Sequence, residues 1–151
     1  AVYASNLLST QDVDLMFRNL IFETNYPNRE EIIKQSANFF FKIHNLGIEF
    51  IDNTAGNTLI KKIGDNEYNF YLVDLNRMSF HDELSLNQRV KNIAKLTNDG
   101  YINKVFSEAY ASLYGVESDV FYALLMKESN NFLDNFNRRK KIKKRLKFWK
   151  K

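Results

Sequence analysis

The sequence predicts an α+β fold that is mostly helical and contains one small β-hairpin. Apolar residues recur at helical spacing over residues 32–43, and Asn28 precedes them at the position of a helix N-cap. Two apolar runs, at residues 58–63 and 68–73, flank the turn sequence Gly64-Asp65-Asn66, which is typical of a hairpin. The chain has 151 residues, of which 44% are hydrophobic, so it can bury the core of one ordinary domain.

The rest of the chain is expected to be helical, apart from a strand end near the N-terminus. Ser85 and Gln88 form a capping box ahead of an apolar-periodic segment, which predicts a helix start. The hairpin is the only sheet that the pattern predicts. The other expected elements are a strand ending at residues 2–4, a short helix at residues 13–22, the end of the first long helix near Gly47, a helix from Asp99 to Gly115, and a last helix that begins near Ser118 and can continue into the C-terminal residues.

The composition of the chain excludes several kinds of protein. The sequence contains no cysteine, which excludes disulfides and thiolate metal sites, and it lacks an apolar run long enough to span a membrane. The formal net charge is +4, yet residues 138–151 contain ten Lys or Arg and no acid, so subtracting these ten leaves −6 for residues 1–137. An acidic body and a strongly basic tail need separate interpretations.

Oxygen-bearing side chains flank the predicted hairpin. Asp52 and Asn57 lie in one polar loop before its first strand, and Asp74 ends its second strand. Because a tight hairpin brings its two ends together, Asp74 is expected beside Asn57. Phosphoryl transfer needs a Mg²⁺ ion held by a few protein oxygens, and a further carboxylate that orients the acceptor hydroxyl and takes its proton. We therefore assign Asp52 as the base and Asn57 and Asp74 as Mg²⁺ ligands, although such residues also commonly serve only to cap turns.

An Asp-x₄-Asn loop followed by a hairpin that ends in Asp is the catalytic arrangement of the protein-kinase-like fold. More specifically, the chain resembles the lipopolysaccharide kinase family that phosphorylates Kdo or heptose, in its Bacteroidetes-type form. The resemblance covers nearly the whole chain and is carried by residues 44–60 (HNLGIEFIDNTAGNTLI), 70–78 (FYLVDLNRM) and 143–150 (KKRLKFWK). In the second segment, Asp-Leu-Asn stands where protein kinases have Asp-Phe-Gly.

The resemblance implies a fold and an activity. Residues 1–137 would form the large, C-terminal lobe of a kinase-like fold, with residues 1–8 as the end of the small lobe and the hinge. The rest of the small lobe would be absent from this chain and would be its partner, so the chain alone is expected to be inactive. The enzyme would use ATP and Mg²⁺ to phosphorylate a sugar hydroxyl of the lipopolysaccharide inner core, Kdo or heptose, on a lipid A–core acceptor. The nucleotide would contact Asn6, Leu59 and Val73.

Three further residues are assigned supporting roles. His44 ends an apolar helical stretch, and it is expected to be a structural histidine bonded to loop backbone rather than a catalytic group. Asn76 and Arg77 lie two and three residues after Asp74, and they are expected to order the turn there.

Departures from the kinase pattern keep two other functions open. Phe50 and Ile51 stand where such enzymes often have His and Arg, and Thr54 stands where protein kinases carry a catalytic-loop Lys. These departures keep open a catalytically inactive, kinase-like binding module as the second possibility. A small helical nucleic-acid-binding protein is the third possibility, but it leaves the acidic residues around the hairpin unexplained.

The basic tail predicts a membrane-surface helix. Ile142, Leu146 and Trp149 recur at i, i+4 and i+7, and basic residues cover the other faces. That pattern is typical of a helix on an anionic membrane, so we expect residues 138–151 to hold a cytoplasmic protein on the inner face of the inner membrane. A solvated tail is the alternative. Nucleic acid is disfavoured because the acidic body argues against a broad phosphate-binding face.

Overall fold

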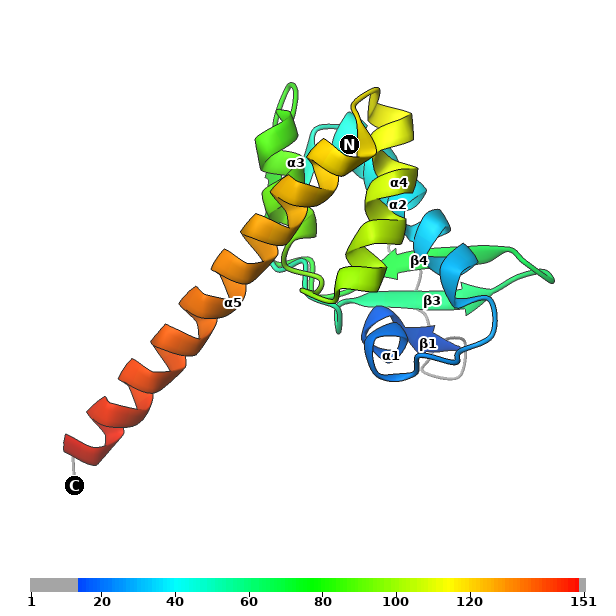
Figure 1. Ribbon diagram of the computed structural model, residues 1–151. Helices are drawn as coiled ribbons and strands as arrows, with labels where there is room; N and C mark the ends of the chain where they lie inside the picture. Colours follow the sequence, from blue (N-terminus) through cyan, green and yellow to red (C-terminus); the bar gives the residue numbers. More distant parts are fainter. Residues whose placement is uncertain (1–13, 150–151) are drawn as a thin grey trace.

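The computed structural model describes residues 14–149 and has the mostly helical α+β architecture that the sequence predicts (Figure 1). The expected strand end at residues 2–4, Asn6 and the hinge lie outside the described residues. The elements are, in chain order, β1 Leu15–Met16, α1 Phe17–Phe22, α2 Arg29–Asn45, β2 Ile48–Phe50, β3 Thr58–Lys62, β4 Tyr68–Leu72, β5 Met78–Phe80, α3 Leu86–Ile93, α4 Gly100–Tyr114 and α5 Ser118–Trp149.

The strands form two antiparallel sheets, whereas the sequence pattern predicts only one. The expected hairpin is present as β3 and β4, with Thr58 opposite Leu72. β1 adds to the edge of β3, so residues 15–16 are a strand and not part of the helix expected over residues 13–22. The second sheet pairs β2 with β5. Strands of two or three residues carry too little alternation to be recognised in a sequence.

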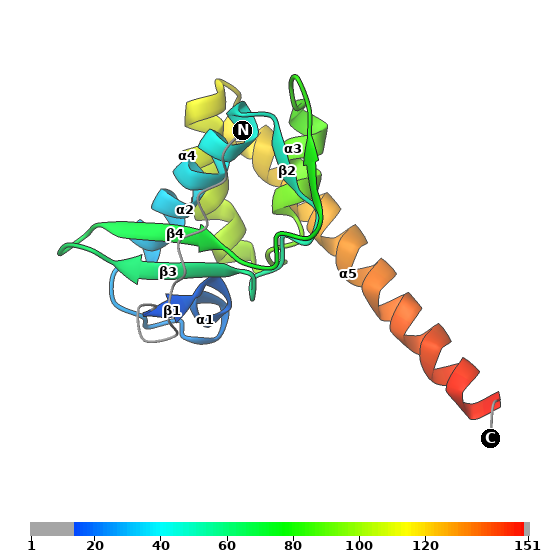
Figure 2. The same cartoon turned by 180° about the vertical axis from the view of Figure 1, so that it is seen from behind.

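The core lies between the helices and the inner face of the three-stranded sheet. Figures 1 and 2 show α2 and α4 on one side of the hairpin, with β1 and α1 along its far edge. Aromatic rings run through the helical layer: the ring centroids of Phe40 and Phe106 are 6.2 Å apart, those of Phe106 and Tyr110 6.0 Å, and those of Tyr110 and Phe121 5.0 Å. Each such side chain stabilises the fold by about 1.5–3 kcal/mol through burial.

The helix ends agree with the capping signals in the sequence, with one exception. Ser85 and Gln88 form the expected capping box, and Gly115 ends α4 with a φ of 87°. Asn28 does precede α2, but its φ is 58° and its side chain makes no cap. It donates instead to the carbonyl of Asp65, at 3.3 Å, and to the hydroxyl of Tyr68, at 3.2 Å. Asn28 therefore ties the start of α2 to the tip of the hairpin.

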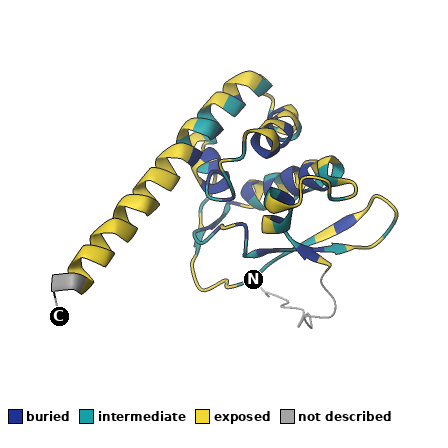
Figure 3. Ribbon diagram, turned by 60° about the horizontal axis from the view of Figure 1, so that its bottom comes forward, coloured by how far each residue is buried: buried dark blue, intermediate teal, exposed yellow. Residues whose placement is uncertain are grey.

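Helix α5 extends well beyond the body of the molecule. Its first turns pack on α3 and α4, as the buried Phe121, Leu125 and Ser129 show. From Asn130 to Lys147 every described residue is exposed, and Figure 3 shows this half standing free. The helix is continuous into the basic tail, as expected. None of the described helices is both long and apolar enough to cross a membrane.

Candidate active site

Two loops lie side by side where the two sheets meet. One loop, residues 51–57, connects β2 to β3, and the other, residues 73–77, connects β4 to β5. The amide of Ile51 donates to the carbonyl of Arg77 at 2.9 Å, and the amide of Val73 donates to the carbonyl of Asn57 at 3.0 Å. Because strand pairing clamps both ends of both loops, the residues that they carry are held next to one another.

The loop that carries Asp52 is a tight, internally bonded turn. The backbone carbonyl of Asp52 accepts from the amide of Thr54, at 2.7 Å, and from the side-chain amide of Asn57, at 2.9 Å. The amide of Asn57 in turn donates to the carbonyl of Thr54 at 2.9 Å. These bonds fix the direction in which the side chain of Asp52 leaves the backbone, and they leave Oδ1 of Asn57 available as a ligand.

The second loop supplies a partner for the Asp52 carboxylate. Arg77 donates to Oδ1 of Asp52 at 3.0 Å, and the Arg77 side chain is 65% exposed against 32% for Asp52. An ion pair this exposed contributes little to stability. The pair holds Oδ1 of Asp52, whereas Oδ2 makes no hydrogen bond or ion pair within the described residues. Arg77 thus acts on the residue assigned as the base rather than only ordering its own turn.

Asp74 lies at the exposed start of the second loop. Its φ is 60°, a left-handed conformation that is uncommon outside glycine, and its Oδ1 accepts from the side-chain amide of Asn76 at 2.8 Å. The structure places the backbones of Asp74 and Asn57 on adjacent loops, but their side chains do not contact each other. Residues held in such sparsely populated backbone regions cluster at functional sites.

The donor set fits Mg²⁺ better than a transition metal. No group of three His, Cys, Asp or Glu side chains gathers anywhere in residues 14–149 in a way that could hold a metal ion by itself. Mg²⁺ does not need such a cage, because it usually takes one or two protein carboxylates and completes its shell with phosphates and water. Asp74 and Asn57, the two assigned ligands, provide one carboxylate and one amide oxygen on neighbouring loops.

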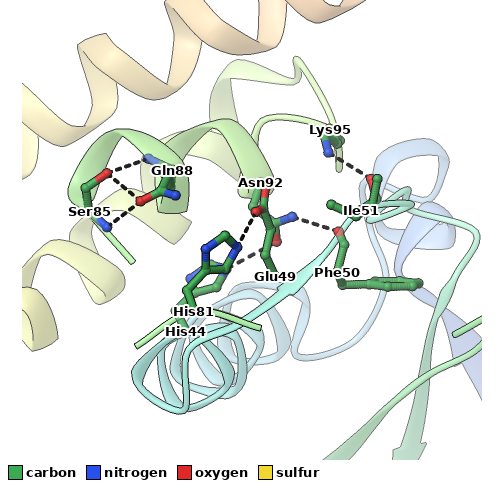
Figure 4. Close-up of polar contacts among 9 residues, drawn as sticks. All are labelled: His44, Glu49, Phe50, Ile51, His81, Ser85, Gln88, Asn92 and Lys95. Atoms are coloured by element: carbon green, nitrogen blue, oxygen red, sulfur yellow. Dashed lines mark hydrogen bonds and ion pairs between the residues drawn. The ribbon is translucent and has the colours of Figure 1, made fainter. Parts of the chain in front are cut away.

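Buried side-chain amides support the first loop (Figure 4), and no local pattern in the sequence predicts this network. Asn92 of α3 donates to the carbonyl of Phe50 at 2.7 Å. Asn53 is fully buried and donates to the backbone carbonyl of Asn92 at 3.0 Å. Lys95 donates to the carbonyl of Ile51 at 2.8 Å. Three side chains therefore hold the backbone around Asp52.

His44 belongs to the same network. Its Nε2 lies 3.2 Å from Oδ1 of Asn92, and its Nδ1 lies 2.7 Å from the hydroxyl of Tyr110. Because a side-chain carbonyl oxygen can only accept, Nε2 carries the proton and Nδ1 accepts from Tyr110. Burial lowers the pKa of His44 to about 4, so the ring is neutral at pH 7. The expectation of a bond to loop backbone was wrong, since His44 reaches the loop through Asn92.

Three other titratable groups, Lys95, Glu49 and His81, lie close to the loops. Burial lowers the pKa of Lys95 from its ordinary value, and the carboxylates of Glu49 and Asp52 oppose that shift. Glu49 also pairs with His81 across β2 and β5, at 3.0 Å. The Lys95 amine therefore interacts electrostatically with the Asp52 carboxylate. No lysine stands at position 54, where protein kinases carry one.

The residues expected to contact a nucleotide share one face of the sheet as far as they are described. Leu59 is opposite Tyr71, and Val73 is two residues beyond Tyr71, so the three side chains point to the same face. That face is opposite the core, since Thr58 and Ile60 are buried while Leu59 and Val73 are only half buried. Asn6 lies outside the described residues.

Comparisons with known proteins show the fold. No family model matches the chain, and no curated protein matches it. Among solved structures it is similar to "WaaP in complex with acyl carrier protein", with a TM-score of 0.53 and 14% sequence identity. The match covers 84% of this chain and 57% of that one, so the chain spans little more than half the length of that protein. At this identity the likeness establishes a common α+β fold with that part of WaaP.

Proposed function

We propose that this chain is the catalytic part of an ATP-dependent kinase that phosphorylates a sugar hydroxyl of the lipopolysaccharide inner core, Kdo or heptose. The observation that carries the proposal is the pairing of the two loops, which holds Asp52 and Arg77 at 3.0 Å beside Asn57 and Asp74. The fold shared with WaaP, itself a lipopolysaccharide-core kinase, supports the same class of reaction.

Each loop residue has a distinct role in this reaction. Asp52 accepts the proton of the acceptor hydroxyl on Oδ2, while Arg77 holds Oδ1 and so fixes the plane of the carboxylate. Asn57 and Asp74 would hold Mg²⁺, which neutralises charge on the transferred phosphate. Because little covalent chemistry falls to the protein in phosphoryl transfer, the main task of this chain is to position the acceptor.

The nucleotide site would need residues from outside the described part of the chain. Leu59 and Val73 offer an apolar, half-buried face for the adenine ring, and Asn6 would contact it from the hinge. A small lobe would supply the groups that hold the phosphates. The acceptor would be a lipid A–core molecule, and the enzyme would then act in the cytoplasm at the inner face of the inner membrane.

Phosphate transfer by the full-length protein tests the proposal. The protein is incubated with labelled ATP, Mg²⁺ and deacylated or intact lipid A–core acceptor, and incorporation of label is measured. Asp52→Asn and Asp74→Asn should each reduce turnover by about a thousandfold or more, because one removes the base and the other a metal ligand. The matched control is Asp82→Asn, an exposed acid beyond β5, which should retain full activity.

The inactive, kinase-like binding module remains the second candidate, and the residue at position 54 favours it. Thr54 stands in the Asp52 loop where protein kinases carry a lysine, which is compatible with a protein that binds nucleotide without transferring phosphate. Mg²⁺-dependent nucleotide binding with no transfer to any inner-core acceptor would establish this alternative and exclude the kinase.

A further inference from the structure

An apolar cleft opens beside the loop that carries Asp52. Its volume is about 570 Å³, and its walls come from α1, from the segment after α3 and from α5. Thr54, Ala55 and Gly56 of the loop form part of the lining, so the cleft is directly adjacent to the candidate active site. A cavity of this size is large enough for part of a lipid chain or a small apolar ligand.

Large apolar side chains at the rim of the cleft are exposed to solvent. Phe22 of α1 is 80% exposed, and Phe132, Leu133 and Phe136 of α5 are 37%, 38% and 55% exposed. Together with the apolar walls they form a contiguous patch, which we call the cleft patch. Single exposed apolar residues need no explanation, but several gathered at one cleft indicate a surface that another molecule covers.

The helix that forms one wall of the cleft continues directly into the basic tail. Five side chains recur along this helix at spacings of four, four, three and four residues: Phe132, Phe136, Lys140, Lys143 and Lys147. At 3.6 residues per turn these side chains form one stripe along the helix. Lys140 lies about 6 Å and Lys143 about 10 Å beyond Phe136 along the helix axis. The stripe therefore changes within two turns from apolar, where α5 forms a wall of the cleft, to basic, where α5 stands free of the body (Figures 1 and 3).

We propose that the cleft patch and this basic stripe form one docking surface for an anionic lipid bilayer. Hydrocarbon covers Phe22, Phe132 and Phe136, and lipid phosphates pair with Lys140, Lys143 and Lys147. Charge complementarity supports this occupant, since the eight Lys and Arg of residues 138–147 face no acid of their own segment. Because Thr54–Gly56 line the same cleft, the bilayer would lie beside the loop that carries Asp52.

Two other occupants fit the surface less well. A second copy that paired its α5 in parallel would place like charges opposite one another along the basic stripe, which is unfavourable. The phosphates of a nucleic acid would pair with the lysines. Its phosphate backbone would gain no binding energy from the apolar cleft, however, unless a base stacked on the aromatic side chains. Only an amphiphile uses both halves of the stripe.

Vesicle co-sedimentation of the purified chain tests the proposal without any need for phosphate transfer, so its outcome is independent of the proposed kinase activity. The vesicles contain phosphatidylcholine alone or mixed with phosphatidylglycerol. The chain should bind only the anionic vesicles. Lys140→Gln/Lys143→Gln/Lys147→Gln should weaken binding about a hundredfold at low salt, at about fivefold per charge.

The aromatic half of the surface is tested by Phe132→Gln/Phe136→Gln. This variant should weaken vesicle binding about tenfold, and the loss should persist at high salt, where charge pairing is screened. Both residues are exposed, so the fold should be retained, which far-ultraviolet circular dichroism checks. The matched controls are Leu113→Gln/Val120→Gln for exposed apolar residues and Lys91→Gln/Lys104→Gln/Lys127→Gln for exposed charges, and both should bind as the unaltered chain does.

Several results would overturn the proposal. Unchanged vesicle binding by the aromatic variant would show that the cleft patch does not meet lipid. Equal loss in the charge control would show that binding depends only on net charge. A dimer in analytical ultracentrifugation that the aromatic variant alone disrupts, with vesicle binding intact, would assign the patch to a second copy. Binding of a single-stranded oligonucleotide that the aromatic variant abolishes would assign it to nucleic acid.

Discussion

Replacing Asn92 by alanine removes the centre of the network that supports the candidate active site. The substitution deletes the bond to the Phe50 carbonyl, at 2.7 Å, and the acceptor for Nε2 of His44, at 3.2 Å. Asn53 keeps its bond to the Asn92 backbone carbonyl, so its amide is still satisfied. Two buried polar groups thus lose their partners, and each such loss costs about 1–3 kcal/mol.

The expected destabilisation for Asn92→Ala is therefore about 4 kcal/mol, a large part of the stability of an ordinary domain. For a chain of this size that corresponds to a fall in Tm of about 8–16 °C. Urea unfolding followed by circular dichroism measures the free energy of unfolding, and a thermal scan measures Tm. Asn87→Ala is the matched control, since Asn87 is an exposed asparagine on the same helix.

The control should change the free energy of unfolding by no more than about 0.5 kcal/mol. If the free energies of unfolding of Asn92→Ala and Asn87→Ala differ by less than about 1 kcal/mol, the network does not hold the loop. Asn92→Asp adds a second check. It keeps an acceptor for His44 but replaces the donor to Phe50 with a carboxylate, so it should also destabilise the chain at neutral pH.

Three other perturbations have clear expected outcomes. The pKa of His44 falls from 6.5 to about 4 in the folded chain, so the stability that its neutral ring contributes is fully present above pH 6.5 and is lost as the pH falls toward 4. Unfolding measured at a series of pH values should show the free energy of unfolding fall by about 3 kcal/mol over this range, and His44→Gln should abolish that fall. Gly47→Ala forces a side chain onto a φ of 71° and into a backbone carbonyl, and should cost about 2–4 kcal/mol in urea unfolding, whereas Gly56→Ala meets nothing within 4 Å and should be nearly neutral. Arg77→Ala should leave the free energy of unfolding within about 0.5 kcal/mol yet lower kcat about a hundredfold in the full-length protein; equal effects on stability and turnover would contradict the orienting role.

The long helices and the hairpin could be predicted because their signals are local. Apolar residues three and four apart define α2 and α4, and the capping box of Ser85 and Gln88 marks the start of α3 within four residues. The turn around Asp65 lies between two runs of equal length. In each case the residues that determine the structure are near neighbours in the chain, so the sequence alone contains the needed information.

The errors all come from contacts between distant segments. β2 and β5 are three-residue strands that form by pairing with each other, and β1 forms by pairing with the edge of β3. Asn28 looks like an N-cap, yet its side chain reaches the hairpin and its backbone turns left-handed. A residue type that suits several roles cannot be assigned one of them until its distant neighbours are known.

The candidate site also has a part that local signals predict and a part that they do not. The adjacency of the two loops can be predicted from the hairpin, because strands that pair must bring their ends together. The hydrogen bonds that support the loops cannot be predicted in this way, since Asn92 bonds to Asn53 and Phe50 across 39 and 42 residues of sequence. From the sequence alone, an asparagine inside an amphipathic helix is expected to be an ordinary surface residue. Its significance depends on the direction in which α3 presents it, and no local pattern specifies that direction.

The position of Asp52 consequently depends on residues that never touch it. The carbonyls of Phe50 and Ile51, just before Asp52, accept from Asn92 of α3 and from Lys95 beyond the end of α3. Helix α2 contributes His44, which bonds to Asn92. Backbone carbonyls held by buried amides and a buried, neutral histidine cannot shift without leaving polar groups unpaired in the core. A carboxylate that must meet an acceptor hydroxyl at hydrogen-bonding distance needs this kind of support, because a displacement of about 1 Å can cost a hundredfold in rate. The helical core of this chain therefore fixes the geometry of the loop as well as stabilising the fold.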